Sequence, residues 1–444
     1  MKHLFQKFRF SFRFLNAIWK KHQKLIILSF LVGILSFSLL PKINQLFFEK
    51  NIVKIGLVGK FTLNELPLEI QQLIGQGLTT LTEDGQTQPF LAESWQTENE
   101  GKEYIFTLKD GFFWHDGQPV LAKDINYHFN DVATAALDDK KIKFILKEPF
   151  SPFPSIVSRP VFKKNLVGTG EYKVKKIIKN GQIIEKLVLT AAKDKQAPKI
   201  IFRFYPTEEA LRTAFKLGEI NVMKEISQPG SLNEWSNLKI GQQVKLNRFV
   251  AVFFNTQNPK LTEKSVRQAL AYAIQKRWSN RALNSINPNS WAYNAGVKKY
   301  EFDLENARTL LGKTEERSEP LKEIELATIP SLFPVAEEIK NDWEQLGVAT
   351  KIKALTSPEE EFEALLITQE VALDPDQYLL WHSTQKTNIS SYKSPKIDNL
   401  LEEGRKTSDL EKRKEIYDDF QRFLVEDTPA VFLFHPTVYS ISRI

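Results

Sequence analysis

The chain has 444 residues, of which 42% are hydrophobic and 26% are charged. This balance is typical of folded globular domains and excludes collagen, coiled coils and extensive disorder. Lys and Arg number 61 against 54 Asp and Glu, a formal net charge of +7, and cysteine is absent. The lack of cysteine excludes disulfide frameworks, cysteine-bound metals, thiol nucleophiles and a lipid-modified cysteine.

The excess of positive charge lies entirely in residues 1–24, which contain seven Lys or Arg and no Asp or Glu. The rest of the chain is therefore electrically balanced. A protein that binds nucleic acid needs a clustered basic face to neutralise phosphates, so we predict no nucleic-acid partner.

An uncharged apolar run, LIILSFLVGILSFSLL, follows at residues 25–40, and apolar residues recur as far as Phe48. At 1.5 Å per residue the run spans about 24 Å as a helix, close to the thickness of a membrane core. We favour an uncleaved signal-anchor over residues 25–48, a single-pass transmembrane helix. The alternative is a signal peptide cleaved near Ser38, which would release a secreted or periplasmic body. In both cases the basic tail 1–24 is cytoplasmic and the body is extracytoplasmic.

The first half of the body mixes strand and helix signals. We predict strands over 52–57, 104–108 and 142–146, a helix over 68–74, and a helix over 122–137 with Ile125, Phe129 and Val132 on one face. Gly168-Thr169-Gly170 leads into a strand, so it is interpreted as a structural turn rather than a phosphate loop, which needs a helix N-terminus. Asn180-Gly181 predicts a hairpin, and a strand over 199–205 precedes a helix over 208–217.

The second half is more helical. Apolar residues repeat at helical spacing over 266–274, 305–311 and 335–346, and Gly347 is placed to end the last of these helices. A capping box at Ser408 opens a helix that includes residues 416–423, and residues 431–434 form a buried strand. The whole pattern predicts an α/β protein without internal repeats.

Several phrases, taken together and in order, resemble one family: the extracytoplasmic solute-binding proteins of ABC importers that take up oligopeptides, dipeptides or nickel complexes (bacterial extracellular solute-binding family 5). The resemblance covers nearly all of residues 52–444. The matching phrases are 91–95 (LAESW), 104–111 (YIFTLKDG), 114–119 (WHDGQP), 122–125 (AKDI), 168–172 (GTGEY), 254–256 (FNT), 266–274 (VRQALAYAI), 374–376 (DPD), 392–398 (YKSPKID) and 427–429 (DTP).

This resemblance implies a two-lobed, hinged periplasmic-binding-protein fold with an extra domain. Lobe I would comprise residues 50–80, 166–250 and 427–444, the extra domain 81–165, and lobe II 251–426. Chain crossings near 248–255 and 426–429 would act as the hinge. Relatives usually have more residues between a helix ending near Leu137 and the strand at Ile142, so we expect a reduced extra domain.

The resemblance also suggests ligand-binding residues. In peptide-binding relatives an aspartate just before the segment that matches Asp374-Pro375-Asp376 holds the peptide amine. The acid nearest upstream in this chain is Glu370, although the usual glycines and aspartate are missing. The residues that we predict to contact ligand are Glu370, Asp374, Trp381, Asn255, Phe253 and Tyr392; a solvated Glu370 and core roles for the aromatic side chains are the alternatives.

The predicted function is capture of short peptides between two lobes and their delivery to an ABC permease and its ATPase subunits, by a monomer without cofactor or metal. The alternatives are a binder of a nickel complex or a sugar, and a sensory or scaffold receptor on the same fold. No catalytic residue is predicted, because the six histidines lack metal-ligand spacing and no GxSxG, SxxK or Walker motif occurs.

Overall fold

The computed structural model describes residues 22–24, 29, 33, 52–194, 196–312, 321–357 and 360–444. The predicted basic tail and the predicted membrane segment 25–48 lie almost wholly outside these residues. Within the described part of the chain, no helix combines the length and apolar character needed to cross a bilayer.

The described body alternates strands and helices along the chain. The strands are β1 (Ile52–Val58), β2 (Thr79–Leu81), β3 (Thr87–Pro89), β4 (Ala92–Glu98), β5 (Glu103–Leu108), β6 (Val132–Ala136), β7 (Lys141–Leu146), β8 (Tyr172–Asn180), β9 (Ile183–Ala191), β10 (Lys199–Tyr205), β11 (Val222–Ile226), β12 (Leu238–Val244), β13 (Arg248–Phe254), β14 (Glu323–Thr328), β15 (Ala349–Ala354), β16 (Ala364–Glu370), β17 (Ala430–Phe434) and β18 (Thr437–Arg443). The α-helices are α2 (Leu68–Ile74), α3 (Phe153–Ile156), α4 (Glu208–Lys216), α5 (Lys264–Ala273), α6 (Leu304–Gly312), α7 (Phe333–Leu346), α8 (Tyr378–Trp381), α9 (Pro395–Lys406) and α10 (Leu410–Asp427).

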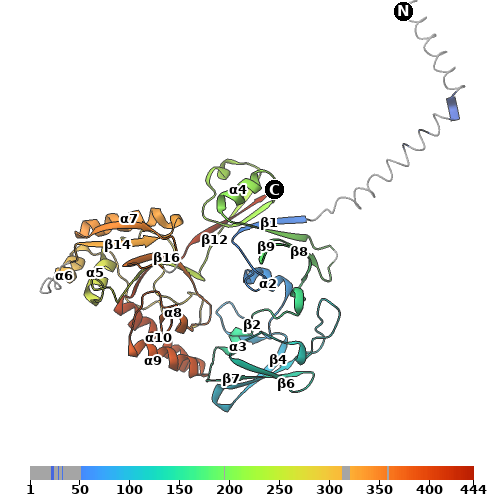
Figure 1. Ribbon diagram of the computed structural model, residues 1–444, viewed down its shortest axis with the longest axis horizontal. Coiled ribbons are helices and arrows are strands. Elements are labelled where there is room, and N and C mark those ends of the chain that lie inside the picture. Colours follow the sequence, from blue (N-terminus) through green and yellow to red (C-terminus); the bar gives the residue numbers. More distant parts are fainter. Residues whose placement is uncertain are drawn as a thin grey trace, which may run out of the picture.

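A seven-stranded sheet forms the centre of the first lobe, here called lobe I. Its order is β12-β18-β11-β1-β10-β9-β8, with β1 parallel to both β10 and β11 and the outer strands antiparallel. Helix α4 connects β10 back to β11 and packs on this sheet (Figure 1). The strand over 199–205, the helix that follows it and the Asn180-Gly181 hairpin are confirmed.

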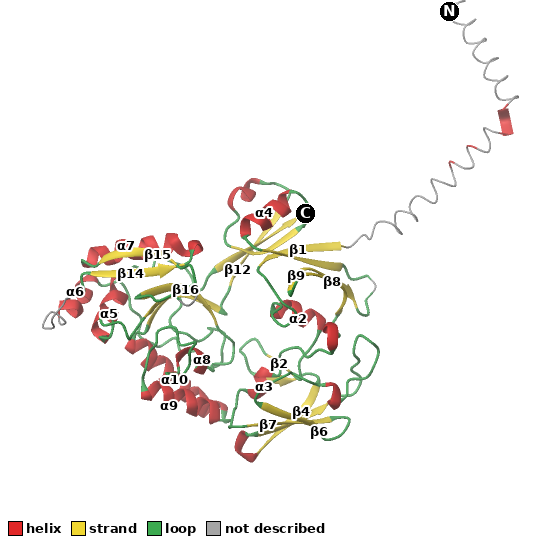
Figure 2. Cartoon of the chain, viewed as in Figure 1, coloured by secondary structure: helices red, strands yellow, loops and turns green. Residues whose placement is uncertain are grey.

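A five-stranded sheet of order β15-β14-β16-β13-β17 forms the centre of the second lobe, lobe II. Strand β13 is almost wholly buried, and its successive side chains reach opposite faces of the sheet: the Phe254 ring stacks on Trp343 of α7, and the Phe253 ring stacks on Trp381 of α8. Helices therefore cover both faces of this sheet, and Figure 2 shows that helices are concentrated in lobe II.

The ends of the lobe II helices follow local chemistry. Gly347 has a φ of 95° and ends α7 in the left-handed conformation that glycine adopts without steric cost, as predicted. Helix α10 begins one residue later than the predicted capping box implies. Asp409, rather than Ser408, is the N-cap, and its carboxylate accepts a hydrogen bond from the Lys412 amide at 2.9 Å.

The extra domain is built on a four-stranded antiparallel sheet of order β4-β5-β7-β6, and it contacts both lobes. On the lobe I side, the His115 amide donates to the Gly168 carbonyl at 2.9 Å. On the lobe II side, the Trp291 amide donates to the Asp84 carbonyl at 2.8 Å, and the Ser151 amide donates to the Arg405 carbonyl at 2.6 Å. The three parts thus surround a common centre (Figure 1).

The prediction of a helix over 122–137 is wrong. Only a short 3-10 turn, Ala122–Asp124, is helical; β6 follows and pairs with β7, with Val132 opposite Leu146. Ile125, Phe129 and Val132 do contact one hydrophobic core, as their spacing suggested. The next strand along the chain, β7, competes with the helical preference here, and the hairpin ladder of hydrogen bonds between β6 and β7 prevails.

The connections between the two lobes lie slightly away from the predicted crossings. Strand β13 starts at Arg248 in the lobe II sheet, so the first connection is 245–247. Strand β17, within the range assigned to lobe I, pairs with β13 in lobe II, and β18 pairs with β11 and β12 in lobe I. The second connection is therefore His435-Pro436. The domain boundaries as a whole stay a prediction.

Gly168 is required by the close packing of two backbones. An added Cβ atom there would lie 2.1 Å from the Ile74 carbonyl oxygen at the end of α2, and a backbone atom cannot move aside. We expect Gly168→Ala to lower the free energy of unfolding by about 1–3 kcal/mol, measured by urea denaturation. Gly241→Ala is the control, because its Cβ would meet only the Ser440 carbonyl at 3.9 Å. An equal effect of both substitutions would contradict this role of Gly168.

Candidate functional site

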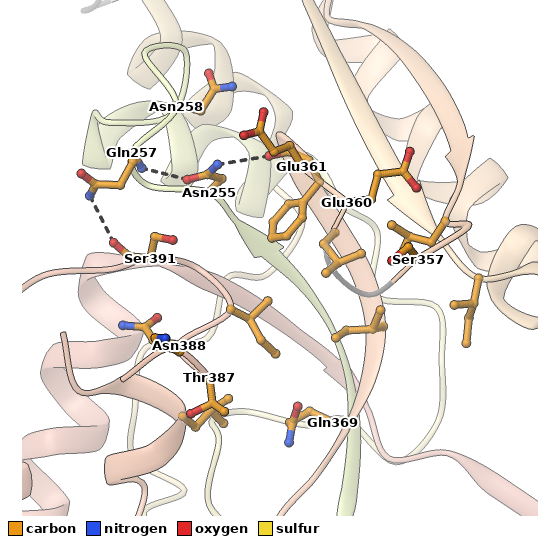
Figure 3. A pocket seen from close by; sticks show the side chains of 18 of the residues that line it. Asn255, Gln257, Asn258, Ser357, Glu360, Glu361, Gln369, Thr387, Asn388 and Ser391 are labelled. Carbon is orange, nitrogen blue, oxygen red and sulfur yellow. Dashed lines mark hydrogen bonds between the residues drawn. The ribbon is translucent and has the colours of Figure 1, made fainter. Parts of the chain in front are cut away.

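A pocket of about 1100 Å³ opens on lobe II, and every residue that lines it comes from that lobe (Figure 3). Its walls are the loop after β13, the β15–β16 connection, one face of β16, and the segment from α8 to the start of α9. The lining residues are Asn255, Gln257, Asn258, Ile329, Leu355, Thr356, Ser357, Glu360, Glu361, Phe362, Leu365, Ile367, Gln369, Leu379, Leu380, Lys386, Thr387, Asn388, Ile389 and Ser391.

The pocket has an apolar floor because of the alternation of β16. Leu365, Ile367 and Gln369 line it, at every second position of the strand, so they lie on one face. Leu379 of α8 also lines the pocket and is 61% exposed, a high value for a large apolar side chain. Exposed apolar surface inside a concave site is typical of ligand pockets.

Amide side chains form part of the wall, and several are already used internally. Asn255 donates to the Phe362 carbonyl at 3.2 Å and accepts from the Gln257 amide at 3.1 Å. Gln257 donates to the Ser391 carbonyl at 3.1 Å (Figure 3). Asn388 donates to the Tyr392 carbonyl at 2.8 Å. These bonds fix the loops and position the backbone of the pocket.

Charged groups of both signs lie on the wall of the pocket. The carboxylate of Glu360 is held by Lys353 at 2.9 Å and by Thr356; hydrogen bonds from these two residues lower the pKa of Glu360 to about 2. The neighbouring Glu361 is exposed, and its carboxylate has no ion-pair partner among the described residues. Lys386, in the segment between α8 and α9, is exposed and likewise unpaired among the described residues. The pocket thus has a free carboxylate and a free ammonium on separate walls.

Two of the six predicted ligand residues, Phe253 and Trp381, lie in the lobe II core. Neither is exposed, and their rings stack on each other with centroids 5.8 Å apart. The Trp381 ring also meets Phe432 edge-on at 6.3 Å. In this structure their side chains contact other core residues, and their role toward ligand stays a prediction.

Asp374 and Tyr392 are buried and bonded within the lobe. Asp374 accepts two hydrogen bonds from Arg413 of α10, at 2.8 and 3.0 Å. Tyr392 donates to the Asp427 carboxylate, and burial together with this bond raises the pKa of Tyr392. Asp376 is paired with Arg405 of α9 at 2.8 and 3.0 Å. The Asp-Pro-Asp phrase therefore anchors the α8 segment to two helices through separate arginines.

The remaining two predicted residues lie at the surface. Asn255 lines the pocket. Glu370 ends β16 on the strand face opposite Gln369; its side chain is 66% exposed, accepts from Asn247 at 3.2 Å and lies 3.9 Å from Arg248 Nε. It is therefore beside the 245–247 connection and does not line the pocket, so the amine role assigned to it stays a prediction.

Sequence reasoning missed Glu361, Lys386, Gln369 and Leu379. The run Glu359-Glu360-Glu361 between two strands was an available signal, because adjacent like charges in a connection are solvated or bind a cation. Nothing in the sequence distinguished Glu360, which is paired, from Glu361, which is not. No group of His, Asp and Glu in the described residues is placed to hold a metal ion.

Comparisons with known proteins agree with this architecture. A family model described as bacterial extracellular solute-binding proteins, family 5 (middle), matches residues 86–392. The chain is 25% identical to the dipeptide-binding protein of Escherichia coli K12, over 80% of this chain and 82% of that protein. It is also 22% identical to the oligopeptide-binding protein AppA of Bacillus subtilis, over 86% of each chain.

Solved structures show the same fold. NikZ from Campylobacter jejuni, in complex with Ni(L-His), superposes with a TM-score of 0.73 at 24% identity, covering 88% of this chain and 94% of that one. AppA from Bacillus subtilis, in complex with a nonapeptide, gives 0.69 at 19% identity with the same coverage. The predicted α/β two-lobed fold is confirmed. Because the family match spans well over half of its residues, the chain belongs to the bacterial extracellular solute-binding proteins of family 5.

Proposed function

We propose that this protein is the extracytoplasmic substrate-binding component of an ABC importer and that it captures short peptides. The observation that carries the proposal is the lobe II pocket, where a free carboxylate, Glu361, and a free ammonium, Lys386, lie on separate walls above an apolar floor. Relatives named as dipeptide-binding and oligopeptide-binding proteins, and a structural neighbour crystallised with a nonapeptide, support this assignment.

The chemistry of a peptide fits this arrangement. A short peptide has an ammonium at one end, a carboxylate at the other, and amides and variable side chains between them. Glu361 would accept from the ammonium, Lys386 would pair with the carboxylate, and Leu379 and Ile367 would cover apolar side chains. Gln369 uses its Nε2 on the Glu370 carbonyl at 2.9 Å, which leaves its oxygen to accept from a peptide amide.

Closure would bring lobe I over this pocket by rotation about the connections 245–247 and 435–436. Lys245, the first residue of the 245–247 connection, is buried and pairs with Glu225, which also accepts from Arg248 at 2.9 Å. A hinge moves by changes at a few residues between rigid bodies, and a ligand drives closure only through a higher affinity for the closed state. The closed, loaded form would be offered to the permease and its ATPase subunits.

The finer location also belongs to this proposal: residues 25–48 hold the body at the outer face of the cytoplasmic membrane as a signal-anchor. The support is the sequence pattern, a cationic N-terminal flank followed by an uncharged apolar run. An anchor of this kind would attach the body to the membrane without a lipid-modified cysteine, which a chain with no cysteine cannot have.

Peptide capture is tested by comparing Glu361→Gln with Glu370→Gln. We expect Glu361→Gln to weaken binding of an unblocked tripeptide about tenfold, equivalent to about 1.4 kcal/mol, because a neutral amide replaces the acceptor of the ammonium. Glu370→Gln should change affinity by less than about twofold, within the range typical of surface substitutions. Isothermal titration calorimetry of the full chain in nanodiscs measures both affinities.

Two other outcomes are informative. A loss confined to Glu370→Gln would return the amine role to Glu370 and place the ligand on the opposite face of β16. An N-acetylated tripeptide serves as the ligand control, because it has no ammonium and should not distinguish wild type from Glu361→Gln. No binding of any peptide to the wild-type protein, with no peptide masses released from it in native mass spectrometry, would contradict the proposed function.

A further inference from the structure

The chain enters the body from the predicted membrane segment at one edge of the lobe I sheet. Strands β1, β10 and β11 run parallel, so their first residues share an edge, and the C-terminal end of α4 returns to that same edge. Asn221, at the start of β11, joins these parts: its side chain accepts from the Lys54 amide at 2.7 Å, and its amide donates to the Lys54 carbonyl at 3.0 Å.

Two large apolar side chains are exposed at this edge. Leu217 directly follows α4 and is 71% exposed, and Trp235 lies in the approach to β12 and is 37% exposed. Arg443 lies between them: its guanidinium donates to the carbonyl of Phe215, two residues before Leu217, at 2.6 Å, and it lies 6.0 Å from the centre of the Trp235 ring. Leu217 and Trp235 therefore belong to one surface patch, here called the β1-edge patch.

Charges of both signs surround the patch. The exposed cations Lys193, Lys216 and Lys239 lie near the acids Asp194, Glu219 and Glu234, and Glu219 is paired with Arg203 at 2.8 Å. An exposed leucine and tryptophan among mixed charges match the amphipathic interface of a bilayer, where aromatic rings sit at the level of the headgroups.

Chain length places this edge close to the membrane. The predicted membrane segment ends at residue 48 and β1 begins at Ile52, and four residues span at most about 14 Å even when fully extended. A tether this short also gives a high effective concentration, so that a contact too weak to hold a free protein on lipid is populated. The start of β1, and the end of the lobe I sheet that it shares with β10 and β11, therefore lies close to the headgroups.

We infer that the β1-edge patch is a membrane-docking surface on which lobe I rests at the lipid headgroups, with Leu217 and Trp235 in the interface. This inference depends on the membrane anchorage proposed above. Docking at this edge would fix the orientation of the body on the membrane. The lobe II pocket and the extra domain, which belong to other parts of the molecule, would then stay in the aqueous phase.

The chain has no cysteine, so a single introduced thiol reports one position. We would label Leu217→Cys with the fluorophore NBD in the full chain reconstituted into phosphatidylcholine vesicles. Leu137→Cys is the matched control, an exposed leucine (52%) in the β6–β7 turn of the extra domain. The expected result is a shift of emission to shorter wavelength and quenching by headgroup-proximal doxyl lipid for position 217, unchanged in high salt, and water-like emission without quenching for position 137.

Flotation of the vesicles separates the two proposals. A full chain that does not float with vesicles would show that the anchorage has failed and the docking inference with it. A chain that floats while positions 217 and 137 give the same emission, whether both water-like or both shifted, would overturn the docking surface and leave the anchorage intact.

Discussion

Replacing Arg413 by methionine is expected to lower the free energy of unfolding by about 3–5 kcal/mol, the range for breaking a buried ion pair by removing one partner. Arg413 is 6% exposed and bonds both oxygens of Asp374, while its Nε donates to the Gly404 carbonyl at 2.9 Å. Without the guanidinium, the Asp374 carboxylate remains in the interior of lobe II with no charge partner.

Urea denaturation followed by circular dichroism measures this loss. Arg422→Met is the control on the same helix, because Arg422 is 58% exposed and its pair with Asp419 is at the surface; surface pairs contribute about 0–1 kcal/mol. The double variant Arg413→Met, Asp374→Leu removes both charges and should recover most of the stability. If Arg413→Met proved as stable as Arg422→Met, the pair would not have the anchoring role described here.

Trp381→Ala is expected to destabilise the protein by about 3–5 kcal/mol, the range for removing a buried large aromatic side chain. The Trp381 side chain is fully buried and stacks on Phe253, so its removal leaves a cavity between β13 and α8. Trp381→Phe should cost less than Trp381→Ala, since one ring remains and the cavity is smaller, and the indole N–H has no hydrogen-bond acceptor among the described residues.

Leu379→Ala is the complementary substitution from the same short helix. Leu379 is 61% exposed and lines the pocket, so this variant should retain its stability and bind peptides with apolar side chains more weakly. Melting temperature and peptide affinity, measured on all three variants, separate a core role from a ligand role. A Trp381→Phe variant with full stability and strongly reduced affinity would restore Trp381 to the binding site.

Local sequence patterns predicted most elements correctly where the determining contacts are themselves local. The alternation of Tyr104, Phe106 and Leu108 predicted a strand with one buried face, and β5 shows that burial. Helix α7 has its apolar face and its glycine stop where the spacing placed them. The family was also accessible from the sequence, because many short phrases in a fixed order are specific even though each alone is weak.

The failures arise where a partner outside the segment decides. Residues 122–137 have helical spacing, yet β7 offers Val132 and its neighbours a strand partner, and pairing with it determines the conformation. The Gly168-Thr169-Gly170 turn was interpreted correctly as structural, but its reason, the Ile74 carbonyl pressed against Gly168, exists only in three dimensions.

The amino-acid sequence by itself determined the family, the α/β class, the location of the excess charge and most helices and strands, because these depend on composition, order and near neighbours. Only the tertiary structure decided which side chains face the pocket. Trp381 and Leu379 are two residues apart, and Glu360 and Glu361 are adjacent, yet one of each pair is engaged within the protein and the other is free. The first difference depends on which face of α8 packs against β13, and the second on which of the two acids Lys353 reaches. Residue type alone does not encode either.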